Sequence, residues 1–485
     1  MQEKKYLIDE PGHFWWRDEK IAEGDFAPAN HVTGQLVIGH DGYVKLDLNG
    51  LLPTEMHAWE QIFNSEARKV PRQIQGILKK SGNHVLLVDA VRVGGQANSS
   101  RFSYEKYFAS LCLVGKAEFP RNAALPKFSS FDVDMSGYED WLEHGTLKVD
   151  LRQRTFAVKG KVVRDLAFNT AFGKLTFKQN TEFPDSGGLH LFSLKMREFV
   201  TLSITHKKSV NAEHVRDQHS KLQELLILLT DSHHSLAWPI VQLNRGKKRY
   251  TLYFHRSMSS ASPPERYDMP TLFNQFKENF GEIFSTWSAK RETFGAGFYG
   301  YASTRREMKL YVENRFANLI QGLESFHRTK YGDQPAAPEF QERVKRILEQ
   351  VKQEDDKTWL DGKLQYAGEP TLATRLFEMF QELPLKLRRR SLKDFCFKCV
   401  SVRNDLAHLG GRRTRESSSN YLQEIEKLSG ALTFMYHMIL LREIGIDDDT
   451  IYRWLYKSYK SFSLKFDLVQ ANLLPQEAVN GKFPK

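Results

Sequence analysis

The dominant spacing of apolar residues differs between the first and the second half of this chain, and this difference constrains the fold more than any other feature. From about residue 32 to 205, apolar and polar residues alternate between turn-forming pairs, which predicts β-strands. After the segment 257–264, SMSSASPP, apolar residues recur every three or four positions, which predicts helices. Strands first and helices afterwards indicate a multidomain chain of the α+β class.

The first region is expected to form a mostly antiparallel sheet structure, either a sandwich or a distorted barrel. A hairpin is predicted at 35–49, because two alternating runs flank a two-residue Asp-Gly turn. A helical stripe of leucines at 211–230 interrupts the strands, and two further strands are predicted at 240–243 and 249–255. We therefore expect a β-rich domain over residues 1–258 with one inserted helix.

Residues 259–304 are predicted to be a linker with a connecting helix, and residues 305–485 an all-α bundle. The stretch 295–300 matches G-x-G-x-x-G, but a helical pattern precedes it where a nucleotide site would need a strand. We expect a flexible turn there. Helical patterns occur at 270–291, 305–330, 338–351, 371–383, 392–409, 421–443 and 448–460.

Composition limits the compartment and the class of partner. The chain has 485 residues and a formal net charge of +11, with a pI near 9.2, which favours a polyanionic partner such as nucleic acid. Three cysteines are too few for a disulfide framework, the first residues lack an apolar signal region, and no run reaches the length of a membrane span. We expect a cytoplasmic protein that does not associate with membranes.

The stretch 392–415 shows the clearest functional pattern. An apolar stripe predicts one buried helix face, made of Leu392, Phe395, Cys399, Val402, Leu406 and Leu409. At about 100° per residue, Asn404 points away from this stripe, His408 lies beside it one turn later, and Arg403 lies on its flank. Arg403 and His408 diverge by roughly 140°, so a second surface must complete any site. The same helix of another copy is the simplest source, which predicts a homodimer or a higher homo-oligomer.

The segment Arg403-Asn-Asp-Leu-Ala-His408 resembles the R-x4-6-H motif of HEPN ribonucleases. The helix 316–328 resembles the opening helix of the C-terminal HEPN domain in ApeA-type anti-phage defence proteins, and the β-rich region resembles the N-terminal domain of that family. The resemblance implies a metal-independent, toxin-like endoribonuclease that acts in abortive infection. It also implies an N-terminal domain that senses infection, through a phage-derived trigger, or restrains the nuclease.

Under this resemblance, Arg403, His408 and Asn404 are the expected catalytic residues. RNA supplies its own nucleophile, the 2′-OH, so the protein has to position the phosphate and move protons. Arg403 suits the phosphate, His408 suits proton transfer near neutral pH, and Asn404 is placed to fix the imidazole or a substrate oxygen. We expect a 2′,3′-cyclic phosphate and a 5′-OH as products, and neither a metal nor a cofactor.

Further residues are expected to support this site. Arg412, Arg413 and Arg415 follow a glycine pair that ends the helix, and we expect them to bind the RNA backbone. Glu324 is expected either to orient Arg403 or Arg328 or to stay solvated, and Arg328 is its neighbour on the same helix. His327, on the apolar stripe of that helix, is expected to be a hydrogen-bonded core histidine. The run Arg388 to Arg390 is either a solvated face or a wall of an RNA groove.

Other interpretations stay open at this point. Cys396-x-x-Cys399 would need two more ligands to bind zinc, and a buried thiol on the stripe is the simpler reading. A second hypothesis is a catalytically silent HEPN scaffold that binds RNA or protein. A third hypothesis is that the β domain binds a ligand and that the helices serve only to join copies of the chain into an oligomer. For the enzyme, single-stranded or loop RNA is the expected partner, with tRNA as one candidate.

Overall fold

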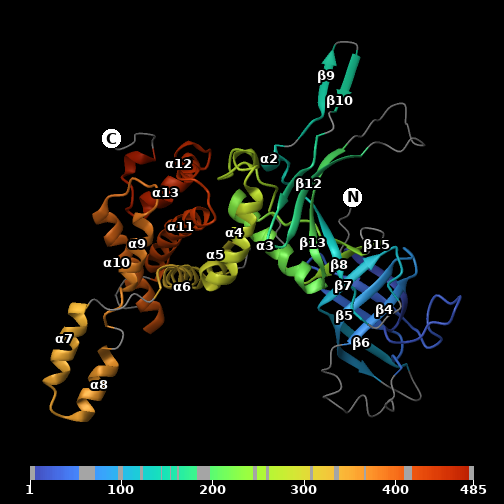
Figure 1. The fold of residues 1–485 in the computed structure, drawn as a ribbon, viewed down its shortest axis with the longest axis horizontal. Helices are drawn as coiled ribbons and strands as arrows, with labels where there is room; N and C mark the ends of the chain where they lie inside the picture. The colour runs from blue at the N-terminus through green and yellow to red at the C-terminus, as the bar shows by residue number, and fades with distance from the viewer. Residues whose placement is uncertain are drawn as a thin grey trace. The chain divides into compact units, whose positions relative to one another are not determined.

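The protein was analysed as a computed structural model, which describes residues 6–53, 72–96, 102–120, 124–143, 145–152, 155–160, 163–182, 197–243, 248–257, 261–305, 310–332, 338–364, 367–408 and 418–479. The chain divides into two compact units (Figure 1). The sheet unit comprises Met1–Gln223, His234–Pro263 and Phe276–Ser285, and the helical unit comprises Glu224–His233, Pro264–Gln275 and Thr286–Lys485.

Six strands of the sheet unit close into a barrel in the order β1-β2-β3-β6-β5-β4. The ring closes because β1 pairs with both β2 and β4, and β6 pairs with both β3 and β5, all antiparallel. The pairing of β2 with β3 confirms the predicted hairpin. The strands are β1 (Ile8–Trp16), β2 (Val32–Ile38), β3 (Val44–Leu48), β4 (Arg72–Leu78), β5 (His84–Gln96) and β6 (Tyr104–Ala109).

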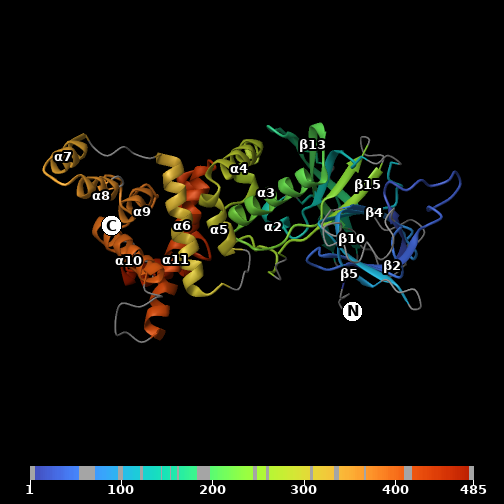
Figure 2. The same cartoon turned by 90° about the horizontal axis from the view of Figure 1, so that it is seen from below.

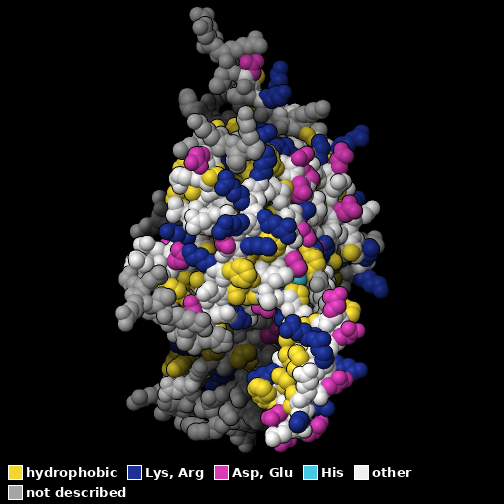
Figure 3. All heavy atoms as spheres, turned by 90° about the vertical axis from the view of Figure 1, so that its left-hand side faces the viewer, with side chains coloured by type: hydrophobic (Ala, Val, Ile, Leu, Met, Phe, Trp, Pro, Cys, Tyr) yellow, Lys and Arg dark blue, Asp and Glu magenta, His cyan; other side chains and the backbone are white. Residues whose placement is uncertain are grey.

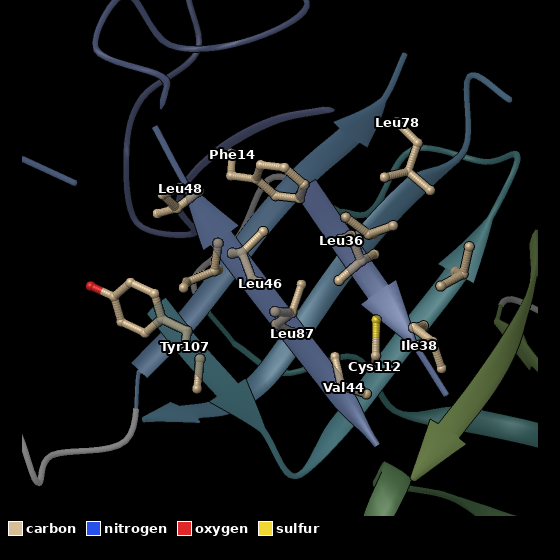
Figure 4. Close-up of a cluster of buried hydrophobic side chains, with 14 of the residues drawn as sticks. Phe14, Leu36, Ile38, Val44, Leu46, Leu48, Leu78, Leu87, Tyr107 and Cys112 are labelled. Atoms are coloured by element: carbon tan, nitrogen blue, oxygen red, sulfur yellow. The ribbon is translucent and has the colours of Figure 1, made fainter. Parts of the chain in front are cut away.

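The barrel interior is filled by apolar side chains from alternate strand positions. In β3, for example, Val44, Leu46 and Leu48 are buried, whereas the residues between them are half-buried. Figure 4 shows this cluster, to which Phe14 and Leu87 also contribute. Alternating burial of this kind is the period-two pattern that the sequence displays.

A second run of strands extends the sheet from β5, and every pairing in it is antiparallel. Its order is β7 (Leu111–Gly115), β15 (Lys248–Phe254), β14 (Ile240–Leu243), β8 (Phe128–Asp134), β13 (Arg197–Val210), β12 (Gly173–Glu182) and β11 (Leu166–Asn169). The strands β9 (Lys148–Arg152) and β10 (Thr155–Lys159) form a separate ribbon. A short α2 (Glu139–Leu142) follows β8, and the predicted inserted helix, α3 (Ala212–Thr230), follows β13. The predicted antiparallel, β-rich N-terminal region is therefore confirmed.

The predicted helical C-terminal region is also confirmed. In Figure 2, α6 and α11 lie side by side, and Gly322 of α6 packs directly against Tyr436 of α11. No described helix is both long enough and apolar enough to cross a membrane. The helices are α4 (Phe280–Phe294), α5 (Ala296–Arg305), α6 (Val312–Tyr331), α7 (Pro338–Glu349), α8 (Glu354–Leu364), α9 (Leu372–Gln381), α10 (Arg389–His408), α11 (Ser418–Glu443), α12 (Asp448–Lys457) and α13 (Ser461–Gln470).

The flexible turn predicted at residues 295–300 is wrong, because α5 begins at Ala296. Its glycines serve helix packing: a Cβ at Gly300 would lie 2.8 Å from the Cα of Gly322, and a Cβ at Gly297 would lie 2.8 Å from the Cα of Phe326. Glycine therefore lets α5 approach the backbone of α6 closely.

Helix α8 was not predicted, because it has few apolar residues and none of them is buried. It follows α7, which also has no buried residue. Figure 3 shows this α7–α8 hairpin as the lobe at the lower right, where a strip of apolar side chains runs between charged ones. Trp359 is 64% exposed there.

Candidate functional site

Helix α10 carries Arg403, Asn404 and His408, the predicted catalytic residues. Its first four stripe residues are buried as predicted, and Phe395 packs with Phe380 of α9 at 6.3 Å between ring centroids. Leu406, the fifth stripe residue, is only half-buried because it lines a pocket. Leu409 lies outside the described residues. The helix is therefore anchored along its first turns and faces an open space near its C-terminal end.

Helix α6 forms the opposite wall of this pocket. Its other face is fixed in the bundle by buried Phe316, Leu319, Leu323 and Phe326. The residues that face the pocket recur every three or four positions along α6, and all of them except Ile320 have polar or small side chains. This spacing places them in one row along the pocket.

The pocket has a volume of about 690 Å³. It is lined from the α6 side by Tyr311, Glu313, Asn314, Ala317, Ile320, Gln321 and Glu324, and from α10 by Arg403, Leu406 and Ala407. Ala317 and Ala407 leave room that longer side chains would occupy. A volume of this size lies within the range of about 300–1,000 Å³ that is typical of small-molecule sites.

Two of the predicted site residues, Arg403 and Glu324, line this pocket from opposite walls. Arg403 donates a hydrogen bond from Nη1 to Oδ1 of Asn404 at 3.2 Å. Arg403 forms no ion pair with any carboxylate that the structure describes, so its guanidinium can still bind an anion. Arg328 does not line the pocket, and it pairs with Glu369 at 3.1 Å and with Glu324 at 3.6 Å.

His408 is the last residue of α10, one turn after Asn404, but its side chain lies outside the described part of the structure. Arg412, Arg413 and Arg415 also lie outside the described residues. The roles of these four residues stay predictions. Arg388 to Arg390, at the other end of the helix, are exposed.

Four polar lining residues were not predicted from the sequence, namely Tyr311, Glu313, Asn314 and Gln321. A signal for two of them was present, because Asn314 and Gln321 fall on one helical face with Ala317 and the predicted Glu324. Polar rows of this kind are common on solvated helices, so the row becomes informative only when α10 is placed opposite.

His327 is a buried core histidine, as predicted. Its Nε2 lies 2.8 Å from Oε2 of Glu378, and its Nδ1 lies 3.4 Å from Nη1 of Arg375. Burial lowers the pKa of His327, and this effect is only partly opposed by Glu378. A neutral ring that donates from Nε2 and accepts at Nδ1 satisfies both neighbours.

The same network reaches the pocket through Glu369. Nη2 of the buried Arg375 donates to Glu369 at 2.8 Å, and Glu369 also pairs with Arg328, which in turn pairs with Glu324. Glu324 is thus linked to the core of the helical unit through a chain of alternating charges. Such a chain limits the positions that its carboxylate can take.

Cys396 and Cys399 are buried side chains in the packed face of α10. Burial raises the pKa of the Cys396 thiol to about 12 and that of Cys399 well above its ordinary value. Cys112 is buried in the barrel core. Within the part of the chain that the structure describes, no three His, Cys, Asp or Glu side chains gather as a metal site would require.

Two family models match the chain. Residues 12–287 match the model described as ApeA N-terminal domain 1, and residues 317–450 match the model described as Apea-like HEPN. The first match covers more than half of the chain, and the second contains α10 with most of α6, which are the two walls of the pocket. No curated protein matches the chain.

Proposed function

Because the chain belongs to the ApeA-type HEPN family, we propose that it is a metal-independent endoribonuclease that cuts cellular RNA in bacterial anti-phage defence by abortive infection. The observation that carries this proposal is the position of Arg403. Its guanidinium lines a pocket, is held by Asn404, lacks an ion-pair partner among the described residues, and lies on the same helix as His408.

The proposed reaction is an in-line attack of a ribose 2′-OH on the adjacent phosphorus. The 2′-O–P bond forms as the P–O5′ bond breaks, which leaves a 2′,3′-cyclic phosphate and a 5′-OH. Arg403 stabilises the charge that builds on the phosphate oxygens. One proton leaves the 2′-OH and another reaches the departing O5′, and imidazole groups are suited to both transfers near neutral pH.

The two proton transfers favour a cleft that is shared by two copies of the chain. A single His408 would have to act first as base and then as acid within one step, whereas two copies supply one imidazole for each role. The divergence of Arg403 and His408 by about 140° on one helix also favours a second contributing surface. We therefore propose a homodimer as the smallest active unit, with single-stranded or loop RNA, including tRNA, as substrate. The sheet unit would act as the sensor or the restraint.

The test compares the purified wild type with Arg403→Ala and His408→Ala on total cellular RNA in the presence of EDTA. The wild type is expected to cut RNA in chelator and leave 2′,3′-cyclic phosphate ends, and both variants are expected to lose cleavage. Arg346→Ala, which removes an exposed arginine of α7, serves as the matched control and should retain it.

Two results would contradict the proposal. Loss of cleavage in EDTA that a divalent ion restores would indicate a metal-dependent enzyme. Absence of cleavage by the wild type, together with RNA binding that His408→Ala leaves unchanged, would indicate a silent HEPN scaffold.

The shared cleft is tested by mixing the Arg403→Ala chain with the His408→Ala chain. If one Arg and one His from different copies suffice, this mixture regains activity. If both sets are needed, each variant mixed with the wild type instead suppresses its activity by forming mixed dimers. Full activity of the wild type at concentrations where light scattering detects only monomer would refute both versions.

A further inference from the structure

The pocket between α6 and α10 carries more negative than positive charge. Its lining includes two carboxylates, Glu313 and Glu324, and one cation, Arg403. A phosphate is attracted at Arg403 but repelled along the α6 wall, because like charges a few ångströms apart are unfavourable. The α6 wall is therefore suited to a neutral part of the ligand that follows the phosphate.

The remaining lining suits a flat, neutral ring. Ala317 and Ile320 contribute small or apolar surface, and the amides of Asn314 and Gln321 can each donate and accept hydrogen bonds. Tyr311 is 79% exposed, so its ring is available for stacking. The volume of about 690 Å³ leaves room for a nucleobase together with its ribose.

The two carboxylates decide which kind of base fits best. An ionised carboxylate only accepts hydrogen bonds, so it has to face donor groups on the base edge. Adenine, cytosine and guanine each carry an exocyclic amino group that donates, whereas uracil has two carbonyl acceptors and a single ring N–H. Glu324 is also held in place by Arg328, which Glu369 binds in turn. This ion pair restrains the Glu324 carboxylate before any ligand arrives.

We infer that this pocket binds a nucleobase with an exocyclic amino group, beside the phosphate that Arg403 holds. The inference rests on the proposed ribonuclease function and adds a base preference to it. Uracil is disfavoured because its carbonyl oxygens would face the carboxylates of Glu313 and Glu324.

The test uses short single-stranded oligo-A, oligo-C and oligo-U of equal length, with binding measured by fluorescence anisotropy and cleavage by gel. The wild type is expected to prefer oligo-A or oligo-C over oligo-U by about 10- to 100-fold, which is the discrimination of one good bidentate base contact. A Glu313→Gln/Glu324→Gln double variant is expected to bring this ratio close to one, because an amide can both donate and accept. Glu342→Gln, at an exposed position of α7, is the matched control and should keep the wild-type ratio.

A second variant tests the shape of the pocket. Ala317→Met fills the space beside Ile320 and is expected to weaken oligo-A binding more than oligo-C binding, because a purine is larger than a pyrimidine. Equal effects on the two ligands would show that the base does not enter this space.

The outcomes separate this inference from the proposed function. If the wild type binds with the expected preference but cuts nothing, the ribonuclease proposal fails and the base pocket stands. If it cuts all three oligonucleotides equally, or if the double variant keeps the preference, the base pocket is refuted and the ribonuclease proposal stands. If the double variant keeps the preference but loses dimers in light scattering, the pocket is an interface between copies of the chain.

Discussion

Asp231 lies at the centre of a buried charge cluster in the helical unit, and its replacement should cost this unit much of its stability. It follows the last residue of α3 with a φ of 52°, a left-handed conformation that few residues other than glycine, asparagine and aspartate adopt easily. Its carboxylate accepts a hydrogen bond from Arg305 of α5, lies 3.3 Å from Nζ of Lys460, and lies 3.6 Å from Nδ1 of His437 in α11. One carboxylate therefore links α5, α11 and the start of α13 to the end of α3.

Asp231→Asn isolates the effect of the charge, because asparagine has the same shape and tolerates the left-handed backbone. Removing one partner of a buried ion pair costs about 3–5 kcal/mol, because the other charge stays buried without compensation. Lys460 is about a third exposed, so water relieves part of this cost, and we expect the unfolding free energy to fall by about 3 kcal/mol. For a unit of this size that corresponds to a fall in Tm of about 6–12 °C.

The assay is thermal unfolding of the purified variants at neutral pH, followed by the helical circular dichroism signal. Asp231→Ala should lose about 1 kcal/mol more than Asp231→Asn, because alanine also strains the left-handed backbone. Asp449→Asn, at an exposed position of α12, is the control and should stay within about 0.5 kcal/mol of the wild type. The charge argument is refuted if Asp231→Asn melts with the wild type, and the backbone argument is refuted if the alanine and asparagine variants melt together.

Three further predictions concern pH, packing and RNA binding. Burial lowers the pKa of His437 from 6.5 to about 4, so the unfolded chain binds more protons than the folded chain between these pH values. The unfolding free energy should therefore fall by about 3 kcal/mol as the pH drops from 6.5 to about 4. Chemical denaturation of His437→Gln over the same pH range should not show this loss. Gly322→Ala should lower Tm because its Cβ would lie 2.6 Å from the Tyr436 hydroxyl, whereas Gly362→Ala, in open space on α8, should not lower it. Replacing Arg412, Arg413 and Arg415 by alanine should weaken RNA binding, and anisotropy titrations should show the slope of log affinity against log salt falling by roughly one unit per lost phosphate contact; an unchanged slope would place the RNA elsewhere.

The sequence is sufficient to predict the two regions and the buried face of α10, because burial leaves a regular period. Leu392, Phe395, Cys399 and Val402 repeat every three or four positions and are buried where that period places them. The closure of the barrel leaves no comparable signal. It depends on β5 pairing with β7 along its first half and with β6 along its second, and on an irregular register between Arg92 and Gly94.

The pocket itself could not be predicted from the sequence, although Arg403 and Glu324 were both predicted to belong to the site. Its space depends on Ala317 and Ala407, from helices that are far apart in the sequence, and an alanine in a helix is unremarkable by itself. The glycines of α5 were wrongly predicted to form a flexible turn for a related reason. Glycine can mark a turn or a close helix contact, and only the neighbouring Gly322 shows which applies to Gly300.

The burial of Cys112, Cys396 and Cys399 has a practical consequence for labelling. Maleimide and iodoacetamide dyes react with exposed thiolates, and these three thiols are protonated and inaccessible in the folded protein. A cysteine introduced at an exposed position, such as that of Phe397 or Trp359, should therefore accept a fluorophore while the native cysteines remain in place. Slow additional labelling of the same sample would then report how often the barrel or the bundle opens.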